Sequence, residues 1–233
     1  MRCGLFGKLS AKRDFIALAT PRSFLEKWEP WVQSCMSASQ HQLGPGWQGA
    51  YLTAPLWRFW LGAEVAGATV LGAFMPSVDG VGRYYPLTLM AVADPNFSIA
   101  PPDLNSQGDW FAQAEDFLLT TLERSKTFDE TSAALDALPP PEAQATVNGA
   151  NEVIRLADAT VGIPTAGKSV QDALTTLRAN NHSTSAAATF WWTEGGGEYP
   201  PLALSARGLL DPFCYTMMLT GKLPAQADNS VQA

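Results

Sequence analysis

Three side chains that could do chemistry stand close together in the stretch PSVDGVGRYYPLTL, residues 76–89. Ser77, Asp79 and Arg83 carry a hydroxyl, a carboxylate and a guanidinium around a turn-forming Asp-Gly-Val-Gly. In one interpretation, Asp79 and Arg83 pair across the loop and fix a hairpin between two apolar runs. In the other, the loop is a recognition surface, because arginine beside polar side chains on a loop suits binding. Neither interpretation needs catalysis, and the residues alone leave both open.

A second stretch, GIPTAGKS at residues 162–169, matches the phosphate-binding pattern G-x-x-x-x-G-K-S. In that pattern backbone N–H groups hold phosphates, Lys168 would reach the outer phosphates and Ser169 would bind Mg²⁺. The motif belongs on the first strand of an α/β domain, whereas here it ends at residue 169 of 233. No later apolar run ends in the aspartate that would hold Mg²⁺, and Glu194 is the nearest substitute. We therefore favour a glycine-rich loop leading into a helix, with nucleotide binding as the alternative.

Other catalytic and metal-binding patterns are missing from the sequence. The two histidines, His41 and His182, each stand at the end of an expected helix with no third residue of metal-ligand type beside them. The three cysteines lie far apart without a Cys-x-x-Cys pair, which fits neither a disulfide framework nor a zinc site. A Gly-x-Ser-x-Gly nucleophile motif does not occur. We expect no enzyme activity, no metal and no cofactor.

Composition favours a soluble, folded protein that does not bind nucleic acid. Apolar residues make up 46% of the chain and charged residues 16%. The formal net charge of −7 would repel a phosphate backbone. The N-terminal MRCGLFGKLSAKRDF lacks the apolar core of a signal peptide, and the apolar runs are too short to span a bilayer. Because free thiols also fit a reducing compartment, we expect a cytoplasmic protein without a membrane span.

Hydrophobic periodicity and turn residues indicate which elements would position these side chains. The predicted strands are 2–7, 56–62, 67–74, 84–92 and 186–194, with a shorter one at VIRLA, residues 153–157. The predicted helices are 20–44, 108–126, 129–138, 169–181 and 209–219. In the first helix we expect Thr20 as the N-cap and Pro30 as a point where the helix kinks or divides.

The order of these elements predicts the fold class. Helices stand before, between and after the strands, and the short connections within residues 56–92 favour an antiparallel meander. So many apolar positions need two covered sheet faces. We expect one α/β domain over residues 1–225, a three-layer sandwich with a mixed, partly antiparallel sheet and helices on both faces. A polar tail would follow at 226–233.

Six short motifs occur in one order along the chain: GLFGKL (4–9), DF (14–15), FLEKWEPWV (24–32), APLWRF (54–59), PSVDGVGRYYPL (76–87) and FWWT (190–193). Together they resemble the TagF family, also called ImpM-type, of accessory proteins of bacterial type VI secretion. The resemblance covers residues 4 to about 92 and, more loosely, the FWWT region. The start departs from the family pattern, because GKLSAKRDF lacks the proline and the glycine that usually precede Asp14.

The resemblance implies a single three-layer α/β domain without known catalytic activity, which restrains type VI secretion after the apparatus proteins are made. As partner it implies a cytoplasmic protein of the activation route that carries a forkhead-associated domain. Some relatives carry a fused protein phosphatase, for which these 233 residues leave no room. We expect the partner to contact the loop from Ser77 to Arg83, including Asp79, together with Arg58 of the neighbouring strand.

Overall fold

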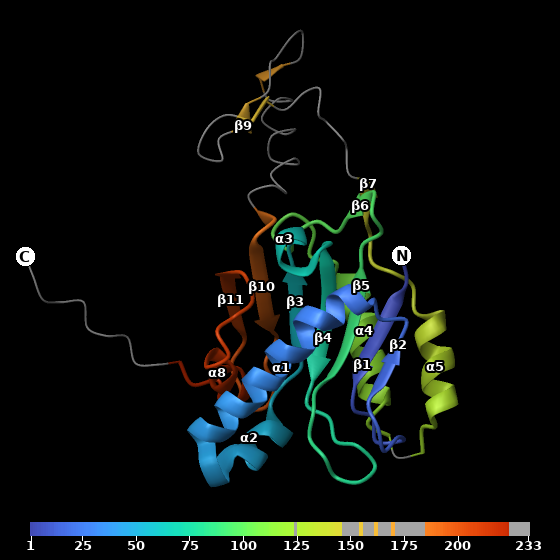
Figure 1. Cartoon of the computed structure of the whole chain (residues 1–233), viewed down its shortest axis with the longest axis vertical. Helices are drawn as coiled ribbons and strands as arrows, with labels where there is room; N and C mark the ends of the chain where they lie inside the picture. The colour runs from blue at the N-terminus through green and yellow to red at the C-terminus, as the bar shows by residue number, and fades with distance from the viewer. Residues whose placement is uncertain (124, 146–153, 156–160, 163–168, 171–184, 224–233) are drawn as a thin grey trace, which may run out of the picture.

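A seven-stranded sheet with the strand order β11-β10-β3-β4-β5-β1-β2 forms the centre of the molecule (Figure 1). The computed structural model describes residues 1–123, 125–145, 154–155, 161–162, 169–170 and 185–223. The strands of the large sheet are β1 (Cys3–Gly7), β2 (Ile16–Leu18), β3 (Trp57–Leu61), β4 (Val70–Met75), β5 (Leu87–Val92), β10 (Ala188–Thr193) and β11 (Leu202–Arg207). Two further sheets have two strands each, β6 (Phe97–Ser98) with β7 (Gln144–Ala145) and β8 (Ile154–Arg155) with β9 (Val161–Gly162).

Helices cover both faces of the sheet and give the fold three layers (Figure 1). One face is covered by α1 (Arg22–Leu43), α2 (Trp47–Thr53) and α8 (Cys214–Thr220). The other is covered by α4 (Gly108–Thr120) and α5 (Phe128–Ala137). The connecting turns are η1 (Gly44–Gly46), between α1 and α2, and α3 (Ala63–Ala66), between β3 and β4. The predicted α/β class with helices on both faces is confirmed.

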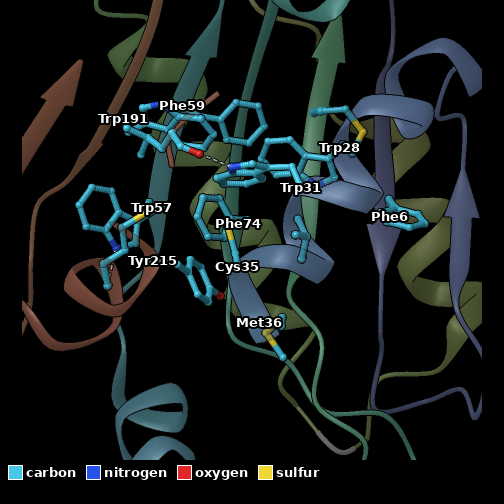
Figure 2. Close-up of a cluster of buried hydrophobic side chains, with 14 of the residues drawn as sticks. Phe6, Trp28, Trp31, Cys35, Met36, Trp57, Phe59, Phe74, Trp191 and Tyr215 are labelled. Carbon is cyan, nitrogen blue, oxygen red and sulfur yellow. Dashed lines mark hydrogen bonds between the residues drawn. The ribbon is translucent and has the colours of Figure 1, made fainter. Parts of the chain in front are cut away.

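Two separate hydrophobic cores result from the alternation of side chains along the central strands. In β3, Phe59 and Leu61 belong to the core that packs against α1, whereas Trp60 belongs to the core that packs against α4. Figure 2 shows the first core, where Trp28 of α1 stacks on Phe59 with ring centroids 4.6 Å apart. The Trp28 indole N–H donates to Thr88 Oγ1 at 3.1 Å. Buried indoles therefore fix α1 on the sheet by both packing and hydrogen bonding.

The large sheet is antiparallel throughout, rather than mixed as the sequence suggested. All six strand pairs run in opposite directions, from β2 at one edge to β11 at the other. Short connections join β3 to β4 and β4 to β5, and only antiparallel neighbours can be joined so directly. The first strand then enters beside β5, and the late strand β10 enters beside β3, both in the antiparallel sense.

Helix α1 runs through Pro30 without dividing. A proline ring removes one N–H from the helix ladder, so the carbonyl of Glu26 loses its usual donor. Both residues are exposed, and water can replace the missing bond. The N-cap is Pro21 rather than Thr20, whose hydroxyl instead donates to the Leu18 carbonyl at 3.0 Å.

Periodicity in the sequence locates the long helices and the central strands but does not predict β2, α2, α3, β6, β7, β9 or β11. The expected strand at VIRLA is present as the two residues of β8. The expected helix 169–181 lies outside the described residues beyond its first two positions, and so does the polar tail 226–233. The domain boundary at residue 225 therefore stays a prediction.

Candidate functional site

The connection between β4 and β5, residues 76–86, forms a closed hairpin. Val78 and Tyr84 form an antiparallel bridge that prolongs the ladder beyond both strands. Above that bridge, the Asp79 N–H donates to the Arg83 carbonyl at 3.0 Å. Only the short tip of the connection lies outside the ladder. The conformation of the whole connection is therefore strongly fixed.

The carboxylate of Asp79 is the centre of this hairpin. Its Oδ1 accepts the backbone N–H groups of Val81 at 3.0 Å and of Arg83 at 2.9 Å. Its Oδ2 accepts Lys8 Nζ at 2.6 Å and Arg83 Nε at 2.7 Å. The Asp79 side chain has 0% exposed surface. A carboxylate that accepts several N–H donors while buried is a structural anchor, since no oxygen remains to meet a ligand.

Two opposing influences set the pKa of Asp79. Burial alone would raise it, because the charged form loses its water. The hydrogen bonds from Lys8, Arg83 and Val81 outweigh burial and hold the pKa of this carboxyl well below its ordinary 3.8. Asp79 is therefore ionised at neutral pH, and it forms a buried ion pair with Lys8.

Lys8 reaches Asp79 from the end of β1. The preceding Gly7 has φ +134°, and a Cβ there would lie 2.1 Å from the Pro86 carbonyl oxygen, so only glycine allows β1 to approach the hairpin this closely. Lys8 itself is 4% exposed, and its Nζ lies 4.5 Å from the centre of the Phe15 ring. The ammonium group is thus enclosed by a carboxylate on one side and an aromatic face on the other.

Ser77 binds the hairpin to its surroundings. Its hydroxyl donates to the Lys8 carbonyl at 2.7 Å. The hydroxyl of Tyr51 in α2 accepts the Ser77 N–H at 3.0 Å and donates to the Ser77 carbonyl at 3.1 Å. Nearby, the Gly80 N–H donates to the Lys12 carbonyl at 2.8 Å. The hairpin is therefore joined both to α2 and to the loop after β1, with Ser77 buried.

Arg83 is the accessible member of the predicted set, with 55% of its side chain exposed. Its Nε is held by Asp79, and its Nη2 donates to the Arg13 carbonyl. The carboxylate of Asp14, 96% exposed, lies 3.8 Å from Nη2. The guanidinium is consequently fixed in position at the surface, with the loop after β1 beside it.

Arg58 lies elsewhere, on the face of the sheet that α4 covers. Its Nε donates to Glu115 of α4 at 2.5 Å, and its Nη1 donates to Glu194 at 2.8 Å. Its guanidinium carbon lies 5.0 Å from the centre of the Phe111 ring. These partners come from α4 and from the residue after β10, and no hydrogen bond or ion pair within the described residues joins the Arg58 side chain to the 76–86 hairpin.

The structure thus brings together Ser77, Asp79 and Arg83 but not Arg58. The pairing of Asp79 with Arg83 is present, as the structural interpretation of the loop expects. Lys8, the partner that is buried with Asp79, is missed by sequence reasoning. A lysine just after an apolar strand gives no sign that it will be buried, and its place within the GLFGKL motif is the one available signal.

The described residues show no further cluster suited to metal or thiol chemistry. No group of three or more metal-ligating side chains occurs among them. Cys3 and Cys35 are buried as free thiols. Burial raises the pKa of Cys3 to about 11 and that of Cys35 higher still, so both remain protonated at neutral pH. In the same part of the chain, no helix combines the length and apolarity needed to span a bilayer.

The GIPTAGKS stretch lies outside the described residues apart from its two ends. Gly162 ends strand β9, and Ser169 is described as well. The residues between them, Lys168 included, have no described placement. The expectation of a glycine-rich loop that binds no nucleotide therefore stays a prediction, with nucleotide binding as its alternative.

Comparison with known proteins identifies the family. A family model described as the TagF N-terminal domain, type VI secretion system-associated, matches residues 4–138, a range that contains the whole Asp79 hairpin and Lys8. Among solved structures, the crystal structure of PA0076 from Pseudomonas aeruginosa PAO1 is similar, with a TM-score of 0.78 and 30% identity over 95% of this chain and 96% of that chain. No curated protein matches. The chain belongs to the TagF family of type VI secretion-associated proteins.

Proposed function

We propose that this protein is a non-enzymatic regulator that restrains type VI secretion after translation by binding a cytoplasmic component of the activation route. Membership of the TagF family supports the association with type VI secretion. The family resemblance suggests a partner with a forkhead-associated domain. The protein itself would act in the cytoplasm, by binding rather than by chemistry.

The observation that carries this proposal is a half-exposed arginine that is fixed from beneath. Arg83 donates from Nε to the buried Asp79 and from Nη2 to the Arg13 carbonyl, while 55% of its side chain faces solvent. Nη1 has no partner within the described part of the chain. An arginine already held in one geometry loses little conformational freedom when it binds a carboxylate or a phosphate. Such an arginine is suited to recognition.

Charges around Arg83 suggest how a partner approaches. The whole chain carries a net charge of −7, which attracts a basic surface at long range. A forkhead-associated domain offers such a surface, since domains that recognise phosphorylated peptides use basic residues. At short range, exposed Asp14 and Arg83 present one charge of each sign within 3.8 Å. We infer that the partner places complementary charges opposite this pair, while Ser77 and Asp79 support the surface from inside.

Arg58 is the weaker candidate for partner contact. Two carboxylates and the Phe111 ring already occupy its guanidinium, and only 16% of the side chain is exposed. A partner at this position would have to displace Glu115 or Glu194. We therefore place Arg83 first and Arg58 second in the proposed binding surface.

A genetic experiment tests the proposal. The gene is deleted in a strain with the apparatus present, and a secreted type VI component is measured with and without complementation. Deletion should raise secretion, the wild type should suppress it again, and Arg83→Glu should not. Arg22→Glu is the matched control, because Arg22 is 92% exposed and contacts only Glu26 one helical turn away within the described residues.

Binding is measured in parallel by a pull-down with purified wild type and both variants. The partner should be retained by the wild type and by Arg22→Glu, and released by Arg83→Glu. Unchanged secretion on deletion would overturn the regulatory role. Suppression by Arg83→Glu at normal protein levels would keep the role but remove this surface from it.

The alternative is nucleotide binding by GIPTAGKS, and its letter-for-letter match to the phosphate-binding pattern is the observation in its favour. Calorimetric titration of the wild type with Mg²⁺-ATP tests it, with Lys168→Ala as the paired variant. We expect no binding in the micromolar range. Micromolar binding that Lys168→Ala abolishes would establish the alternative.

A further inference from the structure

Strand β11 forms one outer edge of the large sheet (Figure 1). It is six residues long and pairs with β10 without a bulge along its full length. Leu202 and Leu204 pack toward the core that contains α1. The alternate side chains of the strand are exposed. β11 is therefore held by β10 on one side, and no strand of the described residues pairs with its other side.

The outward side of β11 carries unpaired backbone groups. The Gly208 N–H donates to the Ala187 carbonyl at 2.7 Å. Because antiparallel strands alternate between residues that bond to the neighbour and residues that do not, every second residue counted back from Gly208 directs its backbone toward β10. The residues between them direct their N–H and C=O groups outward, and these are Ala203, Ser205 and Arg207. No partner for those groups occurs in the described part of the chain.

Proteins usually protect such an edge, and the other edge of this sheet is protected by its shortness. β2 has three residues, too few to offer a continuous ladder. β11 is twice as long and contains neither lysine nor proline, with Arg207 at its end as the one charged residue. On the neighbouring strand β10, the half-buried Phe190 and Trp192 lie on the same sheet face as the side chains of their partners Ser205 and Ala203. An edge with these properties is a ready template for another strand.

We propose that β11 pairs with β11 of a second copy of this chain, antiparallel about a twofold axis at Ser205. In that register Ser205 faces Ser205, and Ala203 faces Arg207 in both halves, so every outward backbone group finds a partner. The pairing is isologous and closes after two copies, because each β11 edge is used up by the β11 edge of the other copy. It joins the two seven-stranded sheets into one continuous sheet.

Side chains support this register over the alternatives. Ala203 and Ser205 are small, so two backbones can approach without a clash. The two Arg207 guanidinium groups lie at opposite ends of the paired strands, whereas a parallel alignment would bring them together. Strand pairing alone buries little surface, so the association is weak and rises with concentration.

Oligomeric state measured by sedimentation from micromolar to millimolar concentration tests the proposal. The wild type should shift from monomer to dimer. Ser205→Pro removes only an outward N–H, so the ladder with β10 stays intact while self-association weakens about ten-fold or more. Ser205→Ala keeps that N–H and should associate like the wild type. Thermal unfolding shows whether the proline variant is folded.

The register has a separate test that does not depend on proline. Ala203→Arg places two like charges opposite each other at both ends and should weaken the dimer several-fold. Adding Arg207→Glu to Ala203→Arg converts both pairs to opposite charges and should restore the dimer.

Thiol cross-linking reports on the same geometry in a Cys214→Ser background. A short reagent should join Ser205→Cys to itself but not Ala203→Cys, whose two copies lie about 14 Å apart along the strands.

A wild type that stays monomeric up to millimolar concentration overturns the proposal. A dimer that persists unchanged in folded Ser205→Pro and in Ala203→Arg also overturns it, because the contact then lies on another surface. Cross-linking of Ala203→Cys to itself would exclude this register and with it the proposed twofold pairing.

Discussion

The Asp79 cluster and the Arg58 cluster both pair carboxylates with cations, but they differ in how deeply their carboxylates are buried. Asp79 has 0% exposed surface and accepts four N–H groups, two of them from the backbone. Arg58 is 16% exposed, and its partners Glu115 and Glu194 are 26% and 70% exposed. Breaking a buried pair leaves an unsolvated charge, whereas exposed pairs contribute little. Burial, rather than the type of charged group, decides which of the two clusters holds the fold.

Replacing the buried carboxylate should have the largest effect on stability. Asp79→Asn leaves the Lys8 ammonium buried without an anion and loses the charge that orients Arg83. We expect the free energy of unfolding to fall by about 3–5 kcal/mol. Denaturant unfolding at pH 7 measures it. A loss below about 1 kcal/mol would show that Asp79 is not the anchor of the hairpin.

Lys8→Met is the companion variant for Asp79→Asn. It removes one of the four donors, but the carboxylate keeps Arg83 and two backbone N–H groups. We expect it to cost less than Asp79→Asn. The reverse order would mean that the lysine, rather than the carboxylate, organises the cluster.

The pH dependence of stability sharpens the same contrast. The pKa of Asp79 in the folded protein lies well below its ordinary 3.8, so the unfolded chain takes up a proton that the folded chain excludes. This contribution is complete above pH 3.8 and is lost as the pH falls through the lower folded pKa. Wild type should lose stability with acidification below 3.8 more steeply than Asp79→Asn, by about one bound proton. Parallel curves would contradict the assignment.

Local sequence patterns predict the hairpin well. They do not predict which side chains become buried by residues far away in the sequence. Asp-Gly-Val-Gly between two apolar runs indicates the turn, and Arg83 four residues after Asp79 indicates their pairing. Lys8 is 71 residues from Asp79 in sequence, so its burial depends on β1 entering the sheet beside β5. Nothing in a lysine after a strand encodes that position.

In the rest of the fold, too, elements with strong local patterns are predicted, and features that depend on distant parts of the sequence are not. The apolar stripe of α1 and the central strands are strong local signals and are predicted. By contrast, LALSAR alternates leucine with small residues, and this weak pattern does not predict a strand. Residues 202–207 form β11 because they hydrogen-bond to β10 along their full length. The sense of the sheet also depends on where strands from distant parts of the sequence enter it. The sequence predicts Arg58 beside the hairpin because its strand neighbours β4, but the Arg58 side chain lies against α4.

Removing Arg58, whose carboxylate partners are partly exposed, should have a smaller effect than removing the buried Asp79 carboxylate. Arg58→Ala loses two partly exposed ion pairs and the contact with Phe111, and we expect a cost of about 1 kcal/mol in the free energy of unfolding. The cost should fall in high salt, because Glu194 is 70% exposed and salt screens its pair with Arg58. Arg22→Ala, at a side chain that is 92% exposed, should be close to neutral. If Arg58→Ala costs as much stability as Asp79→Asn, burial does not decide which cluster holds the fold.

Arg83 links the two settings, because one end of its side chain binds the buried Asp79 and the other faces solvent. In Arg83→Ala the carboxylate keeps Lys8 and the backbone donors, so we expect a stability loss of less than about 1 kcal/mol. If Arg83 also contacts a partner, affinity should fall far more than this loss of stability explains. Thermal unfolding and partner affinity measured on the same preparation separate the two roles. An affinity loss no larger than the loss of stability explains would assign Arg83 to the hairpin alone. An affinity loss with an unchanged melting temperature would assign it to recognition.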